Sequence, residues 1–296
     1  MSSADSLKRL ALSHDSLYQV LDNLGSGLII LDLNKVIIGL NKWALKMTGY
    51  EEEELLGKLA PETLFALFTT ERCTFEYLLQ NNWCEFDALM KRKDQSTFYA
   101  HLLVTVIDTH DRGKMIVINF FDITEKKALE KELFQASITD YLTGLYNRRF
   151  IMETLQKEKE LSDRYNLPFS LVLLDLDYFK FINDIYGHDM GDRVLIEVGR
   201  ILKEKIRASD VSARMGGEEF LILLRNTTLD KATIVAEKIR EEITGIKIPP
   251  LDWVSASFGV TAYQKNEPIN DTLRRADLAL LKAKALGKNC VITFEE

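Results

Sequence analysis

The chain has 296 residues, of which 46% are hydrophobic and 28% charged, a composition that suits a globular protein with more than one domain. Its formal net charge of −7 disfavours a nonspecific nucleic-acid binder, because the phosphates of such a partner would be repelled. No apolar run approaches the roughly 20 residues that a membrane-spanning helix needs, so we expect no transmembrane segment.

The N-terminal segment and the cysteines indicate in which cellular compartment the protein is expected. Charges are spaced among the leucines of residues 1–21, which predicts an amphipathic helix rather than a secretory signal. The chain has three cysteines, Cys73, Cys84 and Cys290. Three is an odd number, and their spacing is not that of metal ligands. We therefore expect reduced thiols in a cytoplasmic protein.

Residues 17–124 alternate short apolar runs with polar turns, which indicates a mixed α/β domain. The apolar runs 27–33 and 35–40 flank Asn34, and this spacing predicts a hairpin. The remaining elements expected here are a helix over 41–58, broken at Gly49 and Gly57, and strands over 97–108 and 114–123.

This region resembles a PAS domain, on the stretch NLGSGLIILDLNKVIIGLNKWALKMTGYEEEELLGK and on FFDITEKKALEKEL at residues 120–133. The resemblance implies a sensory or dimerisation domain over residues 1–124. No His lies between Lys42 and Gln95, and the Asn-Cys-Arg motif of flavin photosensors is missing, so haem and flavin are disfavoured. The ligand of this domain is unknown. Two alternatives stay open: the domain binds a small organic molecule, or it only dimerises and senses nothing.

A helical linker is expected over residues 125–138. Asp122 and Glu125 have the spacing of a capping box, so a helix should begin there. Leu129, Leu133 and Ala136 follow the spacing of a two-stranded coiled coil, although a seam this short is not stable alone. The segment is either a solvated helix or a dimer stalk, and we favour the stalk because of the domain that follows.

The second half alternates helices and strands. The apolar run SLVLLDLD at 170–177 predicts a buried strand, and the period of residues 189–206 predicts an amphipathic helix. Further helices are expected over 229–243 and 269–287, and a further strand over 253–263. This pattern favours an α/β fold in which helices flank a central sheet.

Gly216 and Gly217 predict the turn of a hairpin with strands over 210–215 and 218–225. Asp175 ends the buried strand, and Asp177 should share its face. If the strands pair, Asp175 and Glu218 can converge on a hard cation such as Mg²⁺, while the glycines leave space for phosphates.

Five stretches in this half together resemble the GGDEF domain of diguanylate cyclases, in its Gly-Gly-Glu-Glu-Phe form. They are DYLTGLYNRR (140–149), LDLDYFKFINDIYGHDMGDRVL (174–195), RASDVSARMGGEEF (207–220), SASFGV (255–260) and RADLALLKAKALGKN (275–289). The resemblance covers residues 139–296. It implies a homodimer that condenses two GTP molecules to cyclic di-GMP and releases two pyrophosphates.

The same resemblance implies roles for individual residues. Two Mg²⁺ or Mn²⁺ ions per active site would be held by Asp175, the Leu176 carbonyl and Glu218, and Glu218 or Glu219 could be a general base. The residues implied around the triphosphate are Lys180, Lys284, Lys288, Arg214, Gly216 and Gly217. Those implied at an inhibitory product site are Arg207, Asp210 and, more weakly, Arg240.

Asn183 and Asp192 match the guanine-binding positions. A carboxylate accepts hydrogen bonds from both the N1–H and the exocyclic amine of guanine, a pair of donors that adenine lacks, so Asp192 disfavours an adenine-containing product. A second alternative is an inactive domain that only binds cyclic di-GMP as a receptor or scaffold. The intact Asp175, Glu218, Asn183 and Asp192 argue against it.

Overall fold

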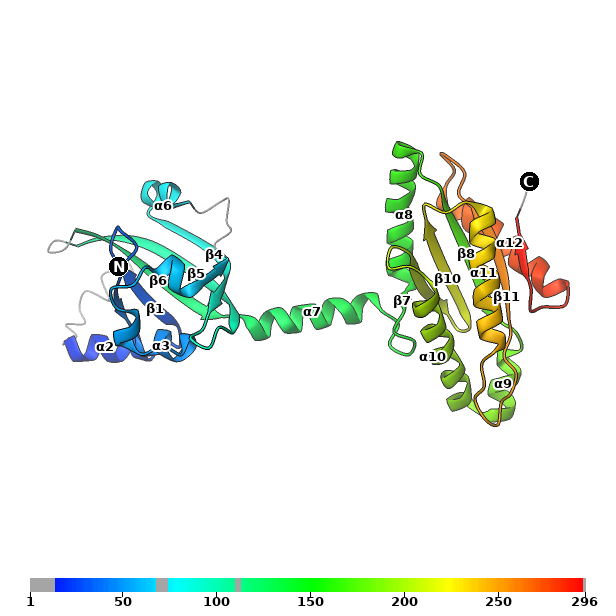
Figure 1. Cartoon of the computed structure of the whole chain (residues 1–296), viewed down its shortest axis with the longest axis horizontal. Coiled ribbons are helices and arrows are strands. Elements are labelled where there is room, and N and C mark those ends of the chain that lie inside the picture. The colour runs from blue at the N-terminus through cyan, green and yellow to red at the C-terminus, as the bar shows by residue number, and fades with distance from the viewer. Residues whose placement is uncertain (1–13, 68–73, 110–112, 295–296) are drawn as a thin grey trace, which may run out of the picture. The chain divides into compact units, whose positions relative to one another are not determined.

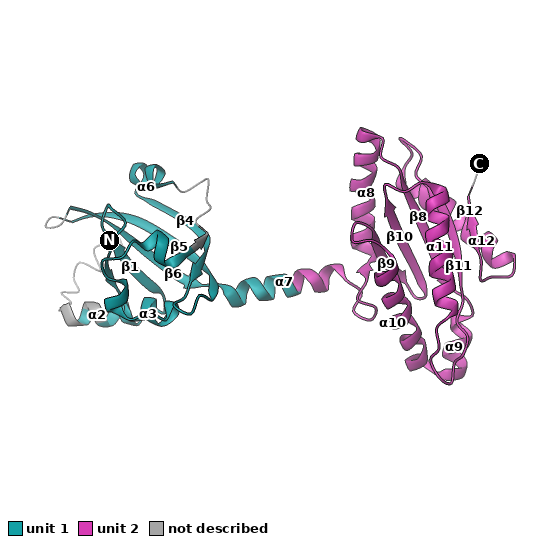
Figure 2. Cartoon of the chain, viewed as in Figure 1, with its two compact units in different colours: residues 1–132 teal, residues 133–296 magenta. Residues whose placement is uncertain are grey.

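The computed structural model describes residues 14–67, 74–109 and 113–294. The chain divides into two compact units, Met1–Glu132 and Leu133–Glu296 (Figure 2). Among the described residues, no helix has both the length and the apolar character needed to cross a membrane.

The first unit contains a six-stranded antiparallel sheet in the order β2-β1-β6-β5-β4-β3 (Figure 1). Its strands are β1 (Gly27–Leu31), β2 (Ile37–Leu40), β3 (Phe65–Leu67), β4 (Trp83–Lys91), β5 (Thr97–Thr109) and β6 (Gly113–Asp122). Its helices are α2 (His14–Asp22), α3 (Lys42–Thr48), α4 (Glu52–Leu55), α5 (Ala60–Leu64) and α6 (Phe75–Asn81).

The core of this unit lies on one face of the sheet. Along β5, Leu102 and Val104 are buried while Leu103 is 36% exposed, as the two-residue period of a strand requires. Leu64 and Leu78, from α5 and α6, pack into the same cluster as Leu102 and Val104. The opposite face of β5 therefore remains open to solvent.

The predicted hairpin is confirmed, since β1 and β2 pair as antiparallel neighbours. Asp32 holds the turn, because its Oδ1 accepts the N–H groups of Asn34 and Val36, both at 2.9 Å. The helix expected over 41–58 is two short helices. Gly49, at φ 73°, ends α3 with its N–H donated to Leu45.

One expectation about the cysteines is wrong. Cys84 is disulfide-bonded, whereas Cys290 is a free thiol and Cys73 lies outside the described residues. Sequence spacing predicts no pairing by itself, because a disulfide depends on which cysteines the fold brings together. The thiol argument for a cytoplasmic location is thereby lost.

The linker is a continuous helix, α7 (Thr124–Ile138). It begins where predicted, but Asp122 Oδ1 accepts the N–H of Thr124 at 2.9 Å rather than that of Glu125, so the expected capping box is wrong in detail. Burial opposes ionisation of Asp122, yet the Thr124 hydrogen bonds and the Arg92 guanidinium hold its pKa below the ordinary value. Leu133 is 71% exposed within the single chain.

The second unit is a six-stranded sheet in the order β12-β11-β8-β10-β9-β7, with helices on both faces (Figure 1). Its strands are β7 (Tyr146–Asn147), β8 (Phe169–Leu176), β9 (Val211–Gly216), β10 (Glu219–Arg225), β11 (Ala256–Ala262) and β12 (Val291–Thr293). Its helices are α8 (Arg148–Tyr165), α9 (Phe179–Tyr186), α10 (His188–Lys205), α11 (Leu229–Thr244) and α12 (Ile269–Ala285).

The central strand β8 is buried along its whole length, as its apolar run predicts. Leu174 and Leu176 join the cluster that includes α10 and α11, whereas Leu171 and Leu173 join the cluster that includes α8 and α12. The alternation assigns Asp175 to the face of α12. The expected α/β fold with a central sheet flanked by helices is confirmed.

Candidate active site

The hairpin of β9 and β10 supplies the carboxylates of the site. Gly216 pairs with Glu219 and Arg214 with Phe220, so Met215 is an extra residue in β9 and forms a bulge. We expected Gly216-Gly217 as the turn, but Gly216 still belongs to β9. The turn is Gly217-Glu218, one residue later, and Gly217 adopts a left-handed φ of 54°.

The backbone places Glu218 and Glu219 close to Asp175 at the end of β8. Glu219 is the direct cross-strand neighbour of Asp175, so their side chains share one face of the sheet. The Glu218 carbonyl accepts the N–H of Leu176 at 3.3 Å, which fixes the turn beside the strand end. The backbone therefore places Glu218 and Glu219 beside the end of the strand that carries Asp175. The convergence of Asp175 and Glu218 on one cation stays a prediction.

A lysine also reaches this cluster. Lys284, in the last turn of α12, places its Nζ 2.9 Å from Asp175 Oδ1. Burial raises the pKa of Asp175 above its ordinary value, and the charges of Glu218 and Glu219 add to this effect, while the Lys284 ammonium opposes it. The buried carboxylate is thus placed where a cation is favoured.

The residues present fit a divalent cation. Among the described residues, no group of three or more His, Cys, Asp or Glu side chains is arranged to hold a metal ion by itself. Mg²⁺, however, is commonly held by one or two carboxylates together with substrate phosphates and water. Asp175 and Glu218 offer such oxygen donors, and the Lys284 ammonium marks the position as one that holds positive charge.

Asp177 has a role that the sequence did not reveal. It is 2% exposed, and its carboxylate accepts the Ser257 hydroxyl at 2.7 Å, the Ser255 hydroxyl at 2.8 Å and the Asn289 N–H at 3.0 Å. These bonds tie the end of β8 to the loop after α12. Because Lys288 directly precedes Asn289, Asp177 fixes the backbone that carries this lysine.

The remaining lysines lie around the same strand end. Lys288 Nζ lies 3.4 Å from the centroid of the Tyr178 ring, a cation–π contact. Lys180 is exposed on α9. Lys284 and Lys288 therefore both contact residues at or just after the end of β8, and their role at the triphosphate stays a prediction.

Asn183 and Asp192 are brought together at the corner of α9 and α10. A Cβ built on Gly191 would lie only 2.0 Å from Asn183 Oδ1, so the amide rests against the backbone next to Asp192. Gly187 joins the two helices and donates its N–H to the Asn183 carbonyl at 2.9 Å. Asp192 is exposed, so its carboxylate is accessible to a ligand.

Arg214 braces the hairpin turn. Its Nε donates to the Gly217 carbonyl at 2.9 Å, and its Nη1 lies 3.3 Å from Asp140 Oδ1. Asp140 also accepts the N–H and hydroxyl of Thr143, at 2.9 and 2.7 Å. In this arrangement Arg214 is bound to protein groups, and Asp140 is a member of the site region that sequence reasoning left without a role.

Arg207 and Asp210 form a tight turn after α10, since the Asp210 N–H donates to the Arg207 carbonyl at 3.0 Å. Asp210 Oδ1 accepts the N–H of Arg225 at 3.1 Å, whereas the Arg207 side chain is exposed and makes no ion pair with a described residue. Arg240 contacts Glu237 and Asn289 instead, so no contact brings it to the other two.

Comparison with family models matches residues 25–125 to "PAS domain" and residues 137–290 to "Diguanylate cyclase, GGDEF domain". The chain is 38% identical over 202 residues to "Diguanylate cyclase DgcM" of Escherichia coli, covering 68% of this chain and 49% of that protein. The chain thus spans about half the length of this curated relative.

Comparison with solved structures also finds diguanylate cyclases and GGDEF domains. The crystal structure of the coiled coil and GGDEF domain of DgcB from Caulobacter crescentus, in complex with c-di-GMP, has a TM-score of 0.55 at 25% identity, covering 58% of this chain and 93% of that one. Diguanylate cyclase SiaD from Pseudomonas aeruginosa, in complex with its activator SiaC, has a TM-score of 0.53 at 42% identity, covering 57% and 66%.

Proposed function

Because the chain belongs to the diguanylate cyclase GGDEF family, we propose that it condenses two molecules of GTP to cyclic di-GMP with release of two pyrophosphates. The observation that supports the proposal is the ion pair of Lys284 with Asp175 at the end of β8, beside the turn that carries Glu218 and Glu219. A carboxylate group beside an amine is suited to binding a metal-bound polyphosphate.

In this proposal Asp175, Glu218 and the Leu176 carbonyl hold two Mg²⁺ or Mn²⁺ ions. When bound, the ions would lower the pKa of the attacking ribose 3′-hydroxyl and neutralise charge on the leaving pyrophosphate. Glu218 or Glu219 accepts the proton of that hydroxyl. The hydroxyl attacks the α-phosphate of the opposing GTP, and pyrophosphate leaves.

Lys284, Lys288 and Lys180 are proposed to bind the triphosphate, with Gly216 and Gly217 allowing its close approach. Arg214 is proposed to act by holding the turn, since its guanidinium is bound to the Gly217 carbonyl and to Asp140. Asn183 and Asp192 select guanine. Adenine would leave the Asp192 carboxylate without its two donors, which sites of this kind penalise strongly.

One unit holds one GTP, so the reaction needs two chains that face each other across a two-fold axis. The exposed apolar residues of α7, Leu129 at 52% and Leu133 at 71%, support a homodimer whose stalk is this helix. The first unit is proposed as the sensor that sets the geometry of the pair. We place the protein in the cytoplasm, where GTP is available.

Product control is the second part of the proposal. Arg207 presents an exposed guanidinium beside the turn that Asp210 closes, and a guanidinium can both grip a phosphate and stack on guanine. Arg240 is proposed only as a distant contributor, because it is engaged by Asn289. Cyclic di-GMP bound at Arg207 and Asp210 would then inhibit the enzyme.

The test is turnover of GTP by the full chain with Mg²⁺, with cyclic di-GMP and pyrophosphate quantified by chromatography. Glu218→Gln should lower the rate on the order of 100-fold or more, because it removes a charged oxygen donor at the reacting centre. Glu241→Gln, on the exposed surface of α11, is the matched control and should be unchanged. Normal turnover by Glu218→Gln would contradict the site, and a wild type that binds cyclic di-GMP without turnover would favour the receptor alternative.

A further inference from the structure

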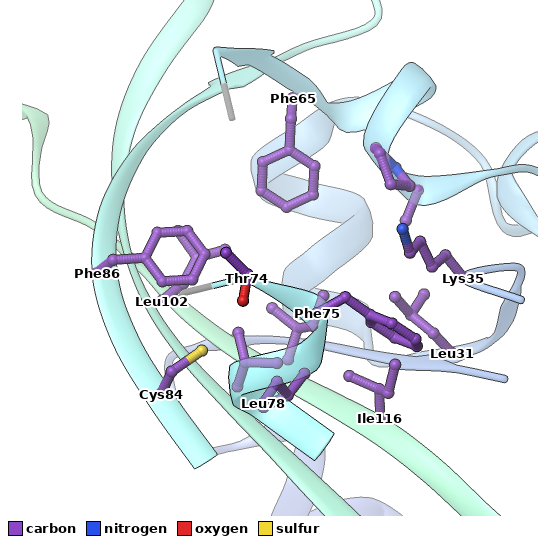
Figure 3. Close-up of a pocket in the computed structure, with 14 residues that line it drawn as sticks. Leu31, Lys35, Phe65, Thr74, Phe75, Leu78, Cys84, Phe86, Leu102 and Ile116 are labelled. Atoms are coloured by element: carbon purple, nitrogen blue, oxygen red, sulfur yellow. The ribbon is translucent and has the colours of Figure 1, made fainter. Parts of the chain in front are cut away.

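A cavity of about 400 Å³ lies within the first unit, between the sheet and the segment that carries α5 and α6 (Figure 3). Its interior wall is formed by fully or almost fully buried hydrocarbon side chains, among them Leu31, Leu102, Ile116 and Ile118. This volume falls within the roughly 300–1,000 Å³ of small-molecule sites. The unit therefore keeps a space in its core that its own side chains do not fill.

The interior of the cavity offers little to a polar ligand. Among the described residues, the buried side-chain atoms without a partner are Asn119 Oδ1 and Arg275 Nε, and neither residue lines the cavity. Thr74 also lines it, but this residue is exposed rather than part of the buried wall, and its Oγ1 accepts the N–H of Tyr77 at 3.1 Å, which caps α6. A sugar or nucleotide placed inside would leave its polar groups unpaired, whereas a hydrocarbon would not.

A positive charge stands at the mouth. Lys35 is the charged residue of the described lining, it is exposed, and it forms no ion pair with a described residue. Its Nζ lies 4.8 Å from the centroid of the Phe75 ring, at the edge of the cavity. Asp32, in the same turn, forms no ion pair with Lys35; its Oδ1 accepts the N–H groups of Asn34 and Val36 instead.

The position of Lys35 is also fixed by the fold. It occupies the β1–β2 turn at a left-handed φ of 67°, and its carbonyl accepts the N–H of Ala60 at 3.1 Å, which joins the turn to α5. A cation held over an aromatic ring at the rim of an apolar cavity is suited to an anionic head whose tail lies inside.

We propose that this cavity binds a medium-chain carboxylate, with its hydrocarbon tail against Leu102, Ile116 and Ile118 and its carboxylate at Lys35. The volume accommodates on the order of ten methylene groups, if each occupies a space similar to the roughly 30 Å³ of a water molecule. A two-tailed lipid is too large, and one ammonium matches one negative charge. This proposal does not depend on the cyclase activity.

The experiment uses the full chain, stripped on a lipid-adsorbing resin and titrated calorimetrically with decanoate, 1-decanol and decyltrimethylammonium. Decanoate should bind with the highest affinity. Lys35→Gln should weaken decanoate binding roughly three- to tenfold, as expected for one partly exposed ion pair, and leave decanol binding unchanged. Because Lys35 is exposed, this variant should fold normally.

A second pair of variants tests the location. Ile118→Phe should fill the cavity and weaken both decanoate and decanol, while Leu103→Phe, on the open face of β5, should weaken neither. Absence of decanoate binding by the stripped wild type would overturn the proposal. So would decanol binding as tightly as decanoate, or an equal loss of both in Lys35→Gln.

Discussion

In the second unit the candidate site contains polar side chains that contact one another, whereas the cavity of the first unit is lined mainly by hydrocarbon, with one ammonium that forms no ion pair with a described residue. Asp175 contacts Lys284 in the candidate site, while the Lys35 ammonium at the cavity lies over the Phe75 ring. The polar site of the second unit depends on the fold around it, because each buried polar group needs its partner. The apolar cavity of the first unit depends on its shape, and the charge of Lys35 can be removed at little cost in the free energy of unfolding.

The largest effect that this contrast predicts is that of Asp177→Ala. The change would leave two serine hydroxyls and the Asn289 N–H without their acceptor, at a cost of about 2–4 kcal/mol in the free energy of unfolding. GTP turnover should also fall, since Lys288 loses its support. Denaturant unfolding measures the change in stability, and a GTP turnover assay measures the change in rate. Asp184→Ala, on the exposed surface of α9, is the control for both. Equal stability of the two variants would show that the network is not needed.

A smaller effect is expected from Arg207→Ala, since Arg207, like Lys35, is an exposed cation that pairs with no acidic side chain in the described part of the chain. Its loss should weaken inhibition by cyclic di-GMP roughly tenfold, with unfolding changed by less than about 0.5 kcal/mol. Initial rates at increasing product concentration give the inhibition constant, and Arg274→Ala, exposed on α12, serves as the control. Identical inhibition of wild type and Arg207→Ala would remove the residue from the inhibitory site.

The smallest expected effect is on stability in acid, and it comes from Asp163. This residue is the centre of a polar cluster in the second unit, outside the candidate site. Its carboxylate accepts Lys159 at 2.6 Å, Tyr263 at 2.8 Å and the Asn266 N–H at 3.0 Å. The Lys159 ammonium and the Asn266 N–H lower its pKa to about 2.

Because the folded-state pKa of Asp163 lies below the unfolded value of roughly 3.9, its contribution to stability is present above the unfolded value and is lost as the pH falls toward 2. Asp163→Asn should therefore flatten the stability profile in this acid range and leave turnover at neutral pH unchanged. Urea unfolding at several pH values between about 2 and 3.9 measures the free energy of unfolding of both proteins. A variant with the same acid dependence as wild type would contradict the assignment.

The sequence predicted the buried strand β8 because its apolar run admits few alternatives. It also predicted that this strand would pair with the strand after the Gly-Gly turn, and β8 does pair with β10. It misplaced the hairpin turn by one residue, since the bulge at Met215 is a property of pairing rather than of composition. It missed the partners of Asp177, which come from elements distant in the chain.

The first unit shows a different limit. Its hairpin could be predicted from Asn34 and the flanking runs, but the cavity could not, because a cavity is a space left between side chains of several elements rather than a pattern along the chain. The disulfide of Cys84 was missed for a related reason. Only the fold determines which distant residues become neighbours.

The ion pair of Lys284 with Asp175 has a consequence for how the nucleotide enters. In the proposed function Lys284 binds the triphosphate, and its ammonium is already paired with the Asp175 carboxylate before any nucleotide is present. A divalent ion at Asp175 would supply the positive charge that Lys284 now gives this buried carboxylate, and would leave more of the ammonium to the phosphate. On this proposal, metal and nucleotide bind more tightly together than either does alone.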